Sequence, residues 1–159
     1  MSVEHTPLSG SDHMTVLSLD ECWALLKAHE VGRLAVSIAN HPDIFPINYV
    51  VDHDTVMFRT AEGTKLAAAV LGTAVAFEID GYDRTTEQAW SVVIKGWATE
   101  IEKMYELFDA QELPLFPWNA APKHRFVRIV PAVTTGRRFV VTDMAEWHHP
   151  VSAFENAPE

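Results

Sequence analysis

The sequence predicts a mainly β protein, in which an antiparallel sheet closes into a barrel flanked by helices. Several short stretches alternate apolar and polar residues with a period of two, which is typical of strands. Tight turns rather than long helices separate these stretches, which favours antiparallel pairing. Seven such strands would leave exposed edges in a single open sheet. A closed barrel is therefore the expected architecture.

Two helices are predicted from their capping signals and their spacing. Ser18 and Glu21 have the spacing of a capping box, and apolar residues follow at helical intervals, which predicts a helix over Leu19–His29. A short alanine-rich helix is expected over Lys65–Leu71, and Gly72 ends it. The order of elements is a helix, three strands, this short helix, two strands, a helix and two closing strands.

The remaining elements follow from periodicity and from turn residues. The predicted strands span residues 33–38, 44–51, 56–60, 73–80, 89–101, 124–130 and 137–142. The predicted turns or breaks span residues 40–43, 52–54 and 81–84. Pro46 places the second strand at an edge or bulge, and Gly96 predicts a bulge or a close backbone approach in the fifth strand. Residues 102–111 are expected to be helical, and residues 113–118 form a proline-rich loop.

The size and composition indicate one globular domain. We expect a loose arm over residues 1–15, the barrel domain over residues 16–145 and a tail over residues 146–159. No apolar run approaches the roughly 20 residues that span a bilayer, and the polar N-terminal stretch lacks a signal-peptide core, so a cytoplasmic location without membrane contact is expected. The single cysteine, Cys22, excludes an internal disulfide and is expected to be a small buried residue. The net charge of −10 argues against a nucleic-acid partner.

The most informative segment is the predicted join between the third strand and the short helix. Here Arg59 and Lys65 lie close in sequence to the hydroxyl groups of Thr60 and Thr64. Cations, hydroxyl groups and free backbone N–H groups at a helix start would suit a phosphate group. The same residues also fit an ordinary solvated helix start, in which Glu62 complements the helix dipole and would repel a phosphate. The residues alone leave both interpretations open.

Other common sites lack their sequence signatures. There is no glycine-rich dinucleotide or P-loop motif, and no Gly-x-Ser-x-Gly elbow of a serine hydrolase. The eight histidines show no Cys/His spacing typical of a metal site, so no metal is expected.

Three segments together resemble one known family. They are residues 46–52 (PINYVVD), residues 58–66 (FRTAEGTKL) and residues 90–96 (WSVVIKG). These segments are similar to those of the pyridoxamine 5′-phosphate oxidase-like flavoproteins, and more narrowly of the small actinobacterial-type members related to nitroimidazole reductases. The resemblance extends from about Leu17 to Phe139.

The resemblance implies a split antiparallel β-barrel of the FMN-binding type, which dimerises and binds FMN between its subunits. The residues that would hold the FMN phosphate are Arg59, Thr60, Thr64 and Lys65. Those that would line one edge of the isoalloxazine ring, largely through backbone groups, are Ile47, Asn48 and Tyr49. Those near the ring and the ribityl chain would be Trp90 and Ser91, while a partner subunit would contribute Trp118 and Arg138. Tyr49, Trp90 and Trp118 could form an aromatic slot, although core packing is the alternative role for at least one of them.

The resemblance further implies an FMN-dependent oxidoreductase that acts on a small conjugated or aromatic substrate. Hydride chemistry belongs to the flavin, so no catalytic side chain need be present. The chain lacks the arginine-rich C-terminal segment of true pyridoxamine phosphate oxidases, so vitamin B6 oxidation is not expected. The alternatives are a non-enzymatic flavin- or ligand-binding module, or a deazaflavin- or haem-binding member of the same fold. Both cofactor alternatives rank below FMN, because the chain offers neither a large basic patch nor an evident axial ligand.

Overall fold

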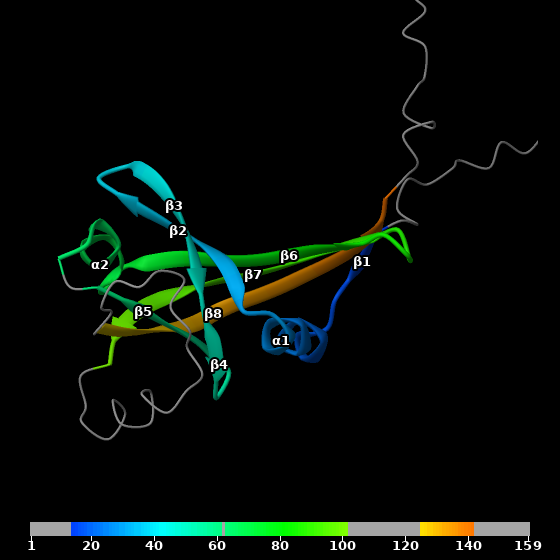
Figure 1. Cartoon of the computed structure of the whole chain (residues 1–159), viewed down its shortest axis with the longest axis horizontal. Helices are drawn as coiled ribbons and strands as arrows, with labels where there is room; N and C mark the ends of the chain where they lie inside the picture. Colours follow the sequence, from blue (N-terminus) through cyan, green and yellow to red (C-terminus); the bar gives the residue numbers. More distant parts are fainter. Residues whose placement is uncertain (1–13, 62, 102–124, 142–159) are drawn as a thin grey trace, which may run out of the picture.

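The structure is a computed structural model that describes residues 14–61, 63–101 and 125–141. The predicted helix over 102–111, the proline-rich loop with Trp118 and the C-terminal tail lie outside these residues. The strands are β1 (Met14–Val16), β2 (Val31–Ile38), β3 (His41–Asn48), β4 (Val50–Asp52), β5 (Thr55–Thr60), β6 (Ala74–Asp83), β7 (Gln88–Glu100) and β8 (Arg125–Val140). The helices are α1 (Leu19–Ala28) and α2 (Lys65–Val70) (Figure 1).

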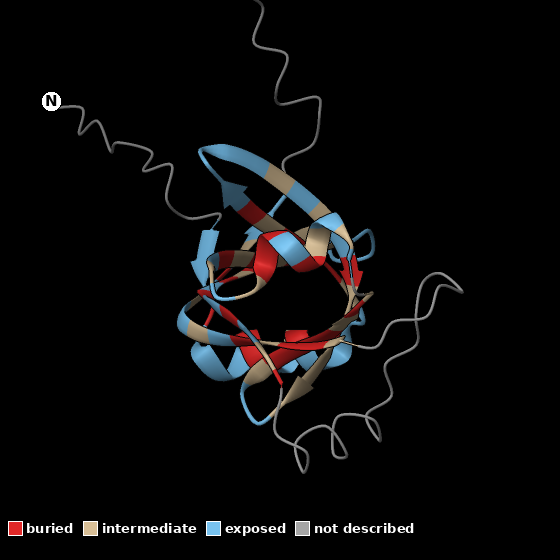
Figure 2. Cartoon of the chain, turned by 90° about the vertical axis from the view of Figure 1, so that its left-hand side faces the viewer, coloured by how far each residue is buried: buried red, intermediate tan, exposed pale blue. Residues whose placement is uncertain are grey.

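The described strands form one sheet whose pairs are all antiparallel. The strand order is β3-β2-β6-β7-β8-β5-β4, with β1 paired to β8. Strands β3 and β4 end this order, yet only Tyr49 separates them in the chain. The sheet must therefore curl until its two edges approach each other, and Figure 2 shows the resulting ring of strands. Pro46 lies in the edge strand β3, where its missing N–H costs no ladder hydrogen bond, as predicted.

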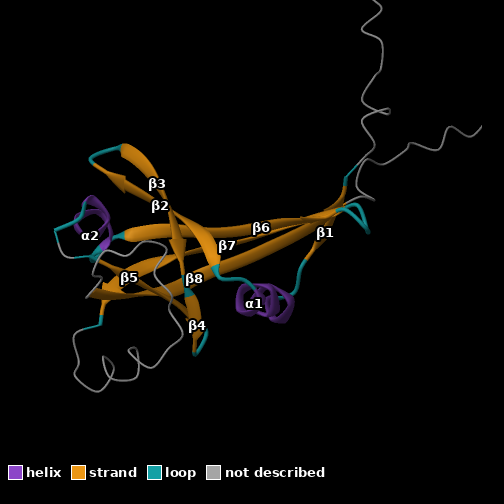
Figure 3. Ribbon diagram, viewed as in Figure 1, coloured by secondary structure: helices purple, strands orange, loops and turns teal. Residues whose placement is uncertain are grey.

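The core fills the interior of the curled sheet. The predicted apolar face of β6 is confirmed, because Val75, Phe77 and Ile79 are all buried. Helix α1 adds Cys22 and other apolar residues to this core, while α2 adds Ala69 and Val70. The two helices lie in different regions of the barrel, as Figure 3 shows. The interpretation of Cys22 as a small buried residue is confirmed.

Local capping and turn chemistry explain where the first elements begin and end. The capping box is confirmed, because the Glu21 N–H donates to Ser18 Oγ at 3.2 Å and the Ser18 N–H donates to the Glu21 carboxylate at 2.7 Å. The β2–β3 turn is shorter than predicted. It has positive φ angles at Ala39 and Asn40, the geometry of a two-residue hairpin turn that matches strand twist. Strand β3 therefore begins at His41.

Four further boundaries differ from the prediction. The predicted strand over 44–51 is divided into β3 and β4, and the two predicted strands over 124–130 and 137–142 are one continuous strand, β8. The predicted break at 81–84 is wrong at its start, because β6 continues to Asp83. Part of the expected N-terminal arm, Met14 and Thr15, pairs with β8 as strand β1. A three-residue strand is too short to show a period, so the sequence pattern did not reveal it.

The bulge predicted at Gly96 is confirmed. Lys95 pairs with Val133 but Gly96 pairs with Pro131, which leaves Ala132 as the extra residue of β8. A Cβ atom on Gly96 would lie 2.1 Å from the backbone oxygen of Val130, so only glycine fits at this point. The bulge also accommodates Pro131 without interrupting β8.

Candidate functional site

The join between β5 and α2 brings two threonine hydroxyl groups together. Thr60 is buried, with 2% of its surface exposed, and its Oγ1 lies 3.1 Å from Thr64 Oγ1. Thr64 is the N-cap of α2: its hydroxyl accepts the Ala67 N–H at 3.1 Å and donates to the Ala61 carbonyl at 2.8 Å. Since that donation uses the only Thr64 hydroxyl proton, Thr60 is the donor between the two hydroxyl groups. Both threonines therefore help to define the join.

Lys65, the first residue of α2, reaches across to strand β3. Its Nζ lies 2.7 Å from Oδ2 of Asp43, and the two side chains are 76% and 36% exposed. Asp43 also accepts the Ile44 N–H at 2.9 Å. The hydrogen bond from Lys65, with that from the Ile44 N–H, lowers the pKa of the Asp43 carboxyl. Asp43 is thus ionised at neutral pH and faces the lysine that was predicted to bind phosphate.

Arg59 lies on the other face of β5 from Thr60. Side chains alternate along a strand, and Thr60 is directed inward while Arg59 is half-buried. The guanidinium carbon of Arg59 lies 5.1 Å from the centre of the Phe126 ring, which is within cation–π range. The structure therefore brings the hydroxyl groups of Thr60 and Thr64 together, while Lys65, next along the chain, directs its ammonium group to Asp43. Arg59 lies on the opposite face of β5 from Thr60.

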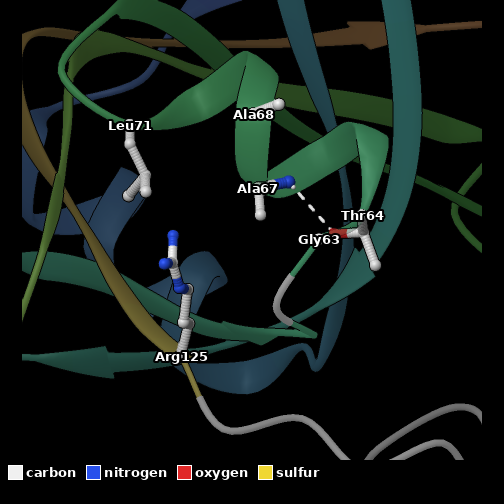
Figure 4. Close-up of a pocket in the computed structure, with 6 residues that line it drawn as sticks. All are labelled: Gly63, Thr64, Ala67, Ala68, Leu71 and Arg125. Atoms are coloured by element: carbon white, nitrogen blue, oxygen red, sulfur yellow. Dashed lines mark hydrogen bonds between the residues drawn. The ribbon is translucent and has the colours of Figure 1, made fainter.

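A cavity of about 450 Å³ lies beside the join (Figure 4). Its lining residues are Gly63, Thr64, Ala67, Ala68, Leu71 and Arg125. Arg125 comes from the start of β8, where it pairs with Thr60, and its guanidinium group extends toward Leu71. The Nε of Arg125 also lies 3.3 Å from Glu100 Oε1. Sequence reasoning missed this arginine as a site residue, because only the β5–β8 register places it opposite the join.

The residues predicted to line the flavin ring have different surroundings. Ile47 is buried in the core, and Asn48 is half-buried at the end of β3. Tyr49 is 2% exposed and packs edge-on against Phe77, with ring centres 4.8 Å apart. Its hydroxyl donates to the Leu26 carbonyl at 2.7 Å, and burial raises its pKa. The Tyr49 ring is therefore part of the barrel core and cannot form the aromatic slot, which leaves only backbone contacts to a ligand at this position.

Trp90, Ser91 and Arg138 lie at the far end of the long strands. Trp90 pairs with Arg138, and its ring centre is 4.7 Å from that of His29. A Cβ atom at Gly81 would come within 2.5 Å of the Trp90 ring, so the indole lies directly over this glycine. Ser91 points to the opposite face and pairs with Arg137.

The ends of β8 show how far apart the two groups of predicted site residues are. Thr60 pairs with Arg125 and Trp90 pairs with Arg138, so the two groups are about 40 Å of strand apart. Figure 1 shows α2 and the far ends of β6 to β8 at opposite sides of the molecule. Within one subunit, the structure does not bring these groups together.

The described part of the chain shows neither a metal-binding group nor a membrane-spanning helix. Among its residues, no three histidine, cysteine or acidic side chains gather as a metal-binding group would require. Neither of the two helices there has the length and apolar character to cross a bilayer.

The curled antiparallel sheet with a strand-to-helix join defines a split β-barrel, as the sequence predicted. The family model of pyridoxamine 5′-phosphate oxidase matches residues 18–138, so the chain belongs to this family. The solved FAD-binding protein of Mycobacterium smegmatis is 45% identical, with a TM-score of 0.71 over 79% of this chain and 98% of that one. The uncharacterized Mycobacterium tuberculosis protein Rv0080 is 35% identical over 78% of this chain and 84% of its own length. A candidate 5-nitroimidazole antibiotic resistance protein of Bacteroides thetaiotaomicron shares the fold at 12% identity, with a TM-score of 0.62 over 79% of this chain and 89% of that one.

Proposed function

We propose that this protein is an FMN-dependent oxidoreductase that acts on a small conjugated or aromatic substrate. The observation that carries the proposal is the β5–α2 join, where the hydroxyl groups of Thr60 and Thr64 lie 3.1 Å apart and Lys65 follows Thr64 directly, in a member of a family with flavin-binding relatives. The join suits a phosphate ester chemically, because hydroxyl and ammonium groups are phosphate donors. The flavin, when bound, supplies the hydride chemistry.

The protein's own residues then serve to bind and orient. Thr60, Thr64 and Lys65 would hold the phosphate, and Arg59 would approach it from the outer face of β5. The backbone of Ile47, Asn48 and Tyr49 would contact the edge of the ring.

A homodimer is part of the proposal, because the predicted cofactor-binding residues lie too far apart within one subunit to contact the same FMN. About 40 Å of strand lies between the β5–α2 join and the pair Trp90 and Arg138, far more than one FMN spans. A second copy related by a two-fold axis would bring its own Trp90, Ser91 and Arg138 to the join of the first copy. Trp118 would also come from that second copy.

The outer face of the sheet supports this assembly. Trp97, Val130 and Val133 project from β7 and β8 and are all exposed, with Trp97 at 56%. A cavity of about 340 Å³ beside them has an apolar lining formed mainly by Ala35, Ala74, Ala76, Gly96, Trp97 and Ala132. Large apolar residues in one exposed patch are typical of an interaction surface. Since this patch lies between the two ends of the long strands, a copy docked on it would complete both cofactor sites.

The phosphate site is tested by removing both of its predicted cations. Arg59→Ala combined with Lys65→Ala should weaken FMN binding by at least about tenfold, since a charge-assisted hydrogen bond contributes about 1.5–3 kcal/mol. Fluorescence titration of the flavin measures this change, with riboflavin as the ligand that lacks the phosphate. Arg33→Ala is the control, because Arg33 pairs with Glu78 on the outer face of β2 and β6. Unchanged FMN affinity in the double variant would contradict the phosphate assignment.

FAD is a second candidate cofactor, because the 45% identical relative is an FAD-binding protein. FAD contains the same riboflavin phosphate, so the same join would bind it. Mass spectrometry of the chromophore released from the purified protein separates FMN, FAD and a deazaflavin. Turnover of NAD(P)H or of a nitroaromatic compound would distinguish an enzyme from a module that only binds the flavin.

A further inference from the structure

The lysine of the candidate phosphate site already has an anionic partner within the chain. Lys65 Nζ and Asp43 Oδ2 are 2.7 Å apart, and this pair connects the first turn of α2 to the edge strand β3. Asp43 is held in place by the Ile44 N–H, which donates to its other carboxylate oxygen at 2.9 Å. The carboxylate therefore occupies a fixed position at the lysine, where a phosphate oxygen would also bind.

We propose that Asp43 is a specificity-determining residue of the site, which competes with the ligand phosphate for Lys65. This inference rests on the proposed function and concerns the same site. A phosphate that binds Lys65 must either displace the Asp43 carboxylate or approach it closely. Both cost free energy, because the first breaks an ion pair and the second places like charges together.

The two threonines strengthen the argument, since they offer the phosphate little compensation in the ligand-free arrangement. The Thr64 hydroxyl proton is donated to the Ala61 carbonyl, and the Thr60 hydroxyl proton is donated to Thr64. The threonine hydroxyl groups can donate to a phosphate only once their protons turn from these acceptors, and the Lys65 ammonium group only once Asp43 releases it. The consequence is a site that discriminates between flavins by the charge of their phosphate group.

The test is the variant Asp43→Asn, which removes the charge and keeps the size of the side chain. The full-length protein is freed of its chromophore by dialysis and titrated with FMN and with riboflavin at fixed salt. The variant should bind FMN about two- to fivefold more tightly, the range expected from one exposed ion pair, while riboflavin binding should not change. Asp54→Asn, an identical change at the exposed tip of the β4–β5 hairpin, should affect neither ligand.

A double-variant comparison identifies the cause of the effect. In a Lys65→Ala background, Asp43→Asn should tighten FMN binding less than it does in the wild-type background, because the competition for the lysine is gone and only the direct repulsion between carboxylate and phosphate remains. If Asp43→Asn leaves FMN affinity unchanged or weakens it, while Lys65→Ala weakens it, the inference about Asp43 is wrong and the proposed function stands. An equal gain in the Lys65→Ala background would also overturn the inference. If Lys65→Ala itself has no effect on FMN binding, the phosphate site of the proposed function fails instead.

Discussion

At the scale of single residues, Tyr49 shows how a motif position can have a structural role. It is the one residue between β3 and β4, where the chain passes from one edge of the sheet to the other. Its N–H donates to the Glu30 carbonyl at 2.9 Å and its hydroxyl donates to the Leu26 carbonyl at 2.7 Å. Tyr49 therefore holds the C-terminal end of α1 against the barrel. Its sequence context pointed to a ligand, but only the fold reveals these two carbonyl partners.

Replacing Tyr49 with phenylalanine should destabilise the protein, although the ring stays in place and the core keeps its packing. The change leaves a buried carbonyl of α1 without its donor, which costs about 1–3 kcal/mol of unfolding free energy. Chemical denaturation of the wild-type and Tyr49→Phe proteins measures the difference. FMN affinity should be retained, since the proposed flavin contact at this position uses the backbone.

The unfolding free energies of the wild-type and Tyr49→Phe proteins should also differ in how they depend on pH. Burial raises the pKa of Tyr49 in the folded state, so the unfolded chain releases this proton at lower pH. The buried, neutral phenol of the wild-type protein should therefore contribute fully to the unfolding free energy below pH about 10, the pKa of an unperturbed tyrosine. Above that pH the stability should fall progressively. Tyr49→Phe should show a smaller alkaline loss. Parallel curves for the two proteins would contradict the role assigned to the phenol.

At the scale of elements, the alternating pattern predicted most of the strand interiors but not their ends. The sequence showed the inward faces of β2 and β6, because burial on one face forces a period of two. It did not show that β6 and β7 continue as a hairpin past Gly81, because glycine there resembles a break. In the fold, the missing side chain makes room for Trp90. The strand predicted to end at residue 130 likewise continues in the fold, where Pro131 lies in β8 at the bulge opposite Gly96.

The β7–β8 bulge gives a prediction at this scale. Gly96→Ala would place a methyl group 2.1 Å from the Val130 backbone oxygen, and backbone cannot move aside as a flexible side chain can. We expect a loss of about 1–3 kcal/mol in unfolding free energy, the usual cost of overpacking. Thermal or chemical denaturation measures it. Lys95→Ala, at the exposed neighbouring position, should change stability by less than about 0.5 kcal/mol; equal stabilities of the two variants would contradict the steric argument.

At the scale of the whole molecule, the sequence predicted the barrel and the strand-to-helix join between β5 and α2 but could not place the candidate site residues relative to one another. Distances between Thr60 and Trp90 depend on the register of β5, β7 and β8, which no local pattern contains. The register separates these residues and also brings Arg125 opposite Thr60. The site that we propose therefore needs two copies of the chain, as the family resemblance also implied.

This requirement makes the oligomeric state the decisive property of the whole molecule. A stable dimer needs about 1,200–2,000 Å² of buried surface, and large apolar side chains such as Trp97 dominate the energy of such interfaces. Trp97→Asp places a charged, strongly hydrated carboxylate in the centre of the proposed apolar contact, and burying it against a second copy would cost free energy, so the protein should become monomeric. In the proposed dimer the partner completes each cofactor site, so flavin content should fall together with the dimer. Light scattering after size-exclusion chromatography, with the visible spectrum recorded on the same peak, measures both.

Leu19→Asp is the matched control: Leu19 is 58% exposed on α1, away from the sheet face, and its replacement should leave mass and colour unchanged. A monomeric Trp97→Asp protein that keeps its full flavin would show that one subunit holds the cofactor alone, and a dimeric one would show that the copies meet elsewhere.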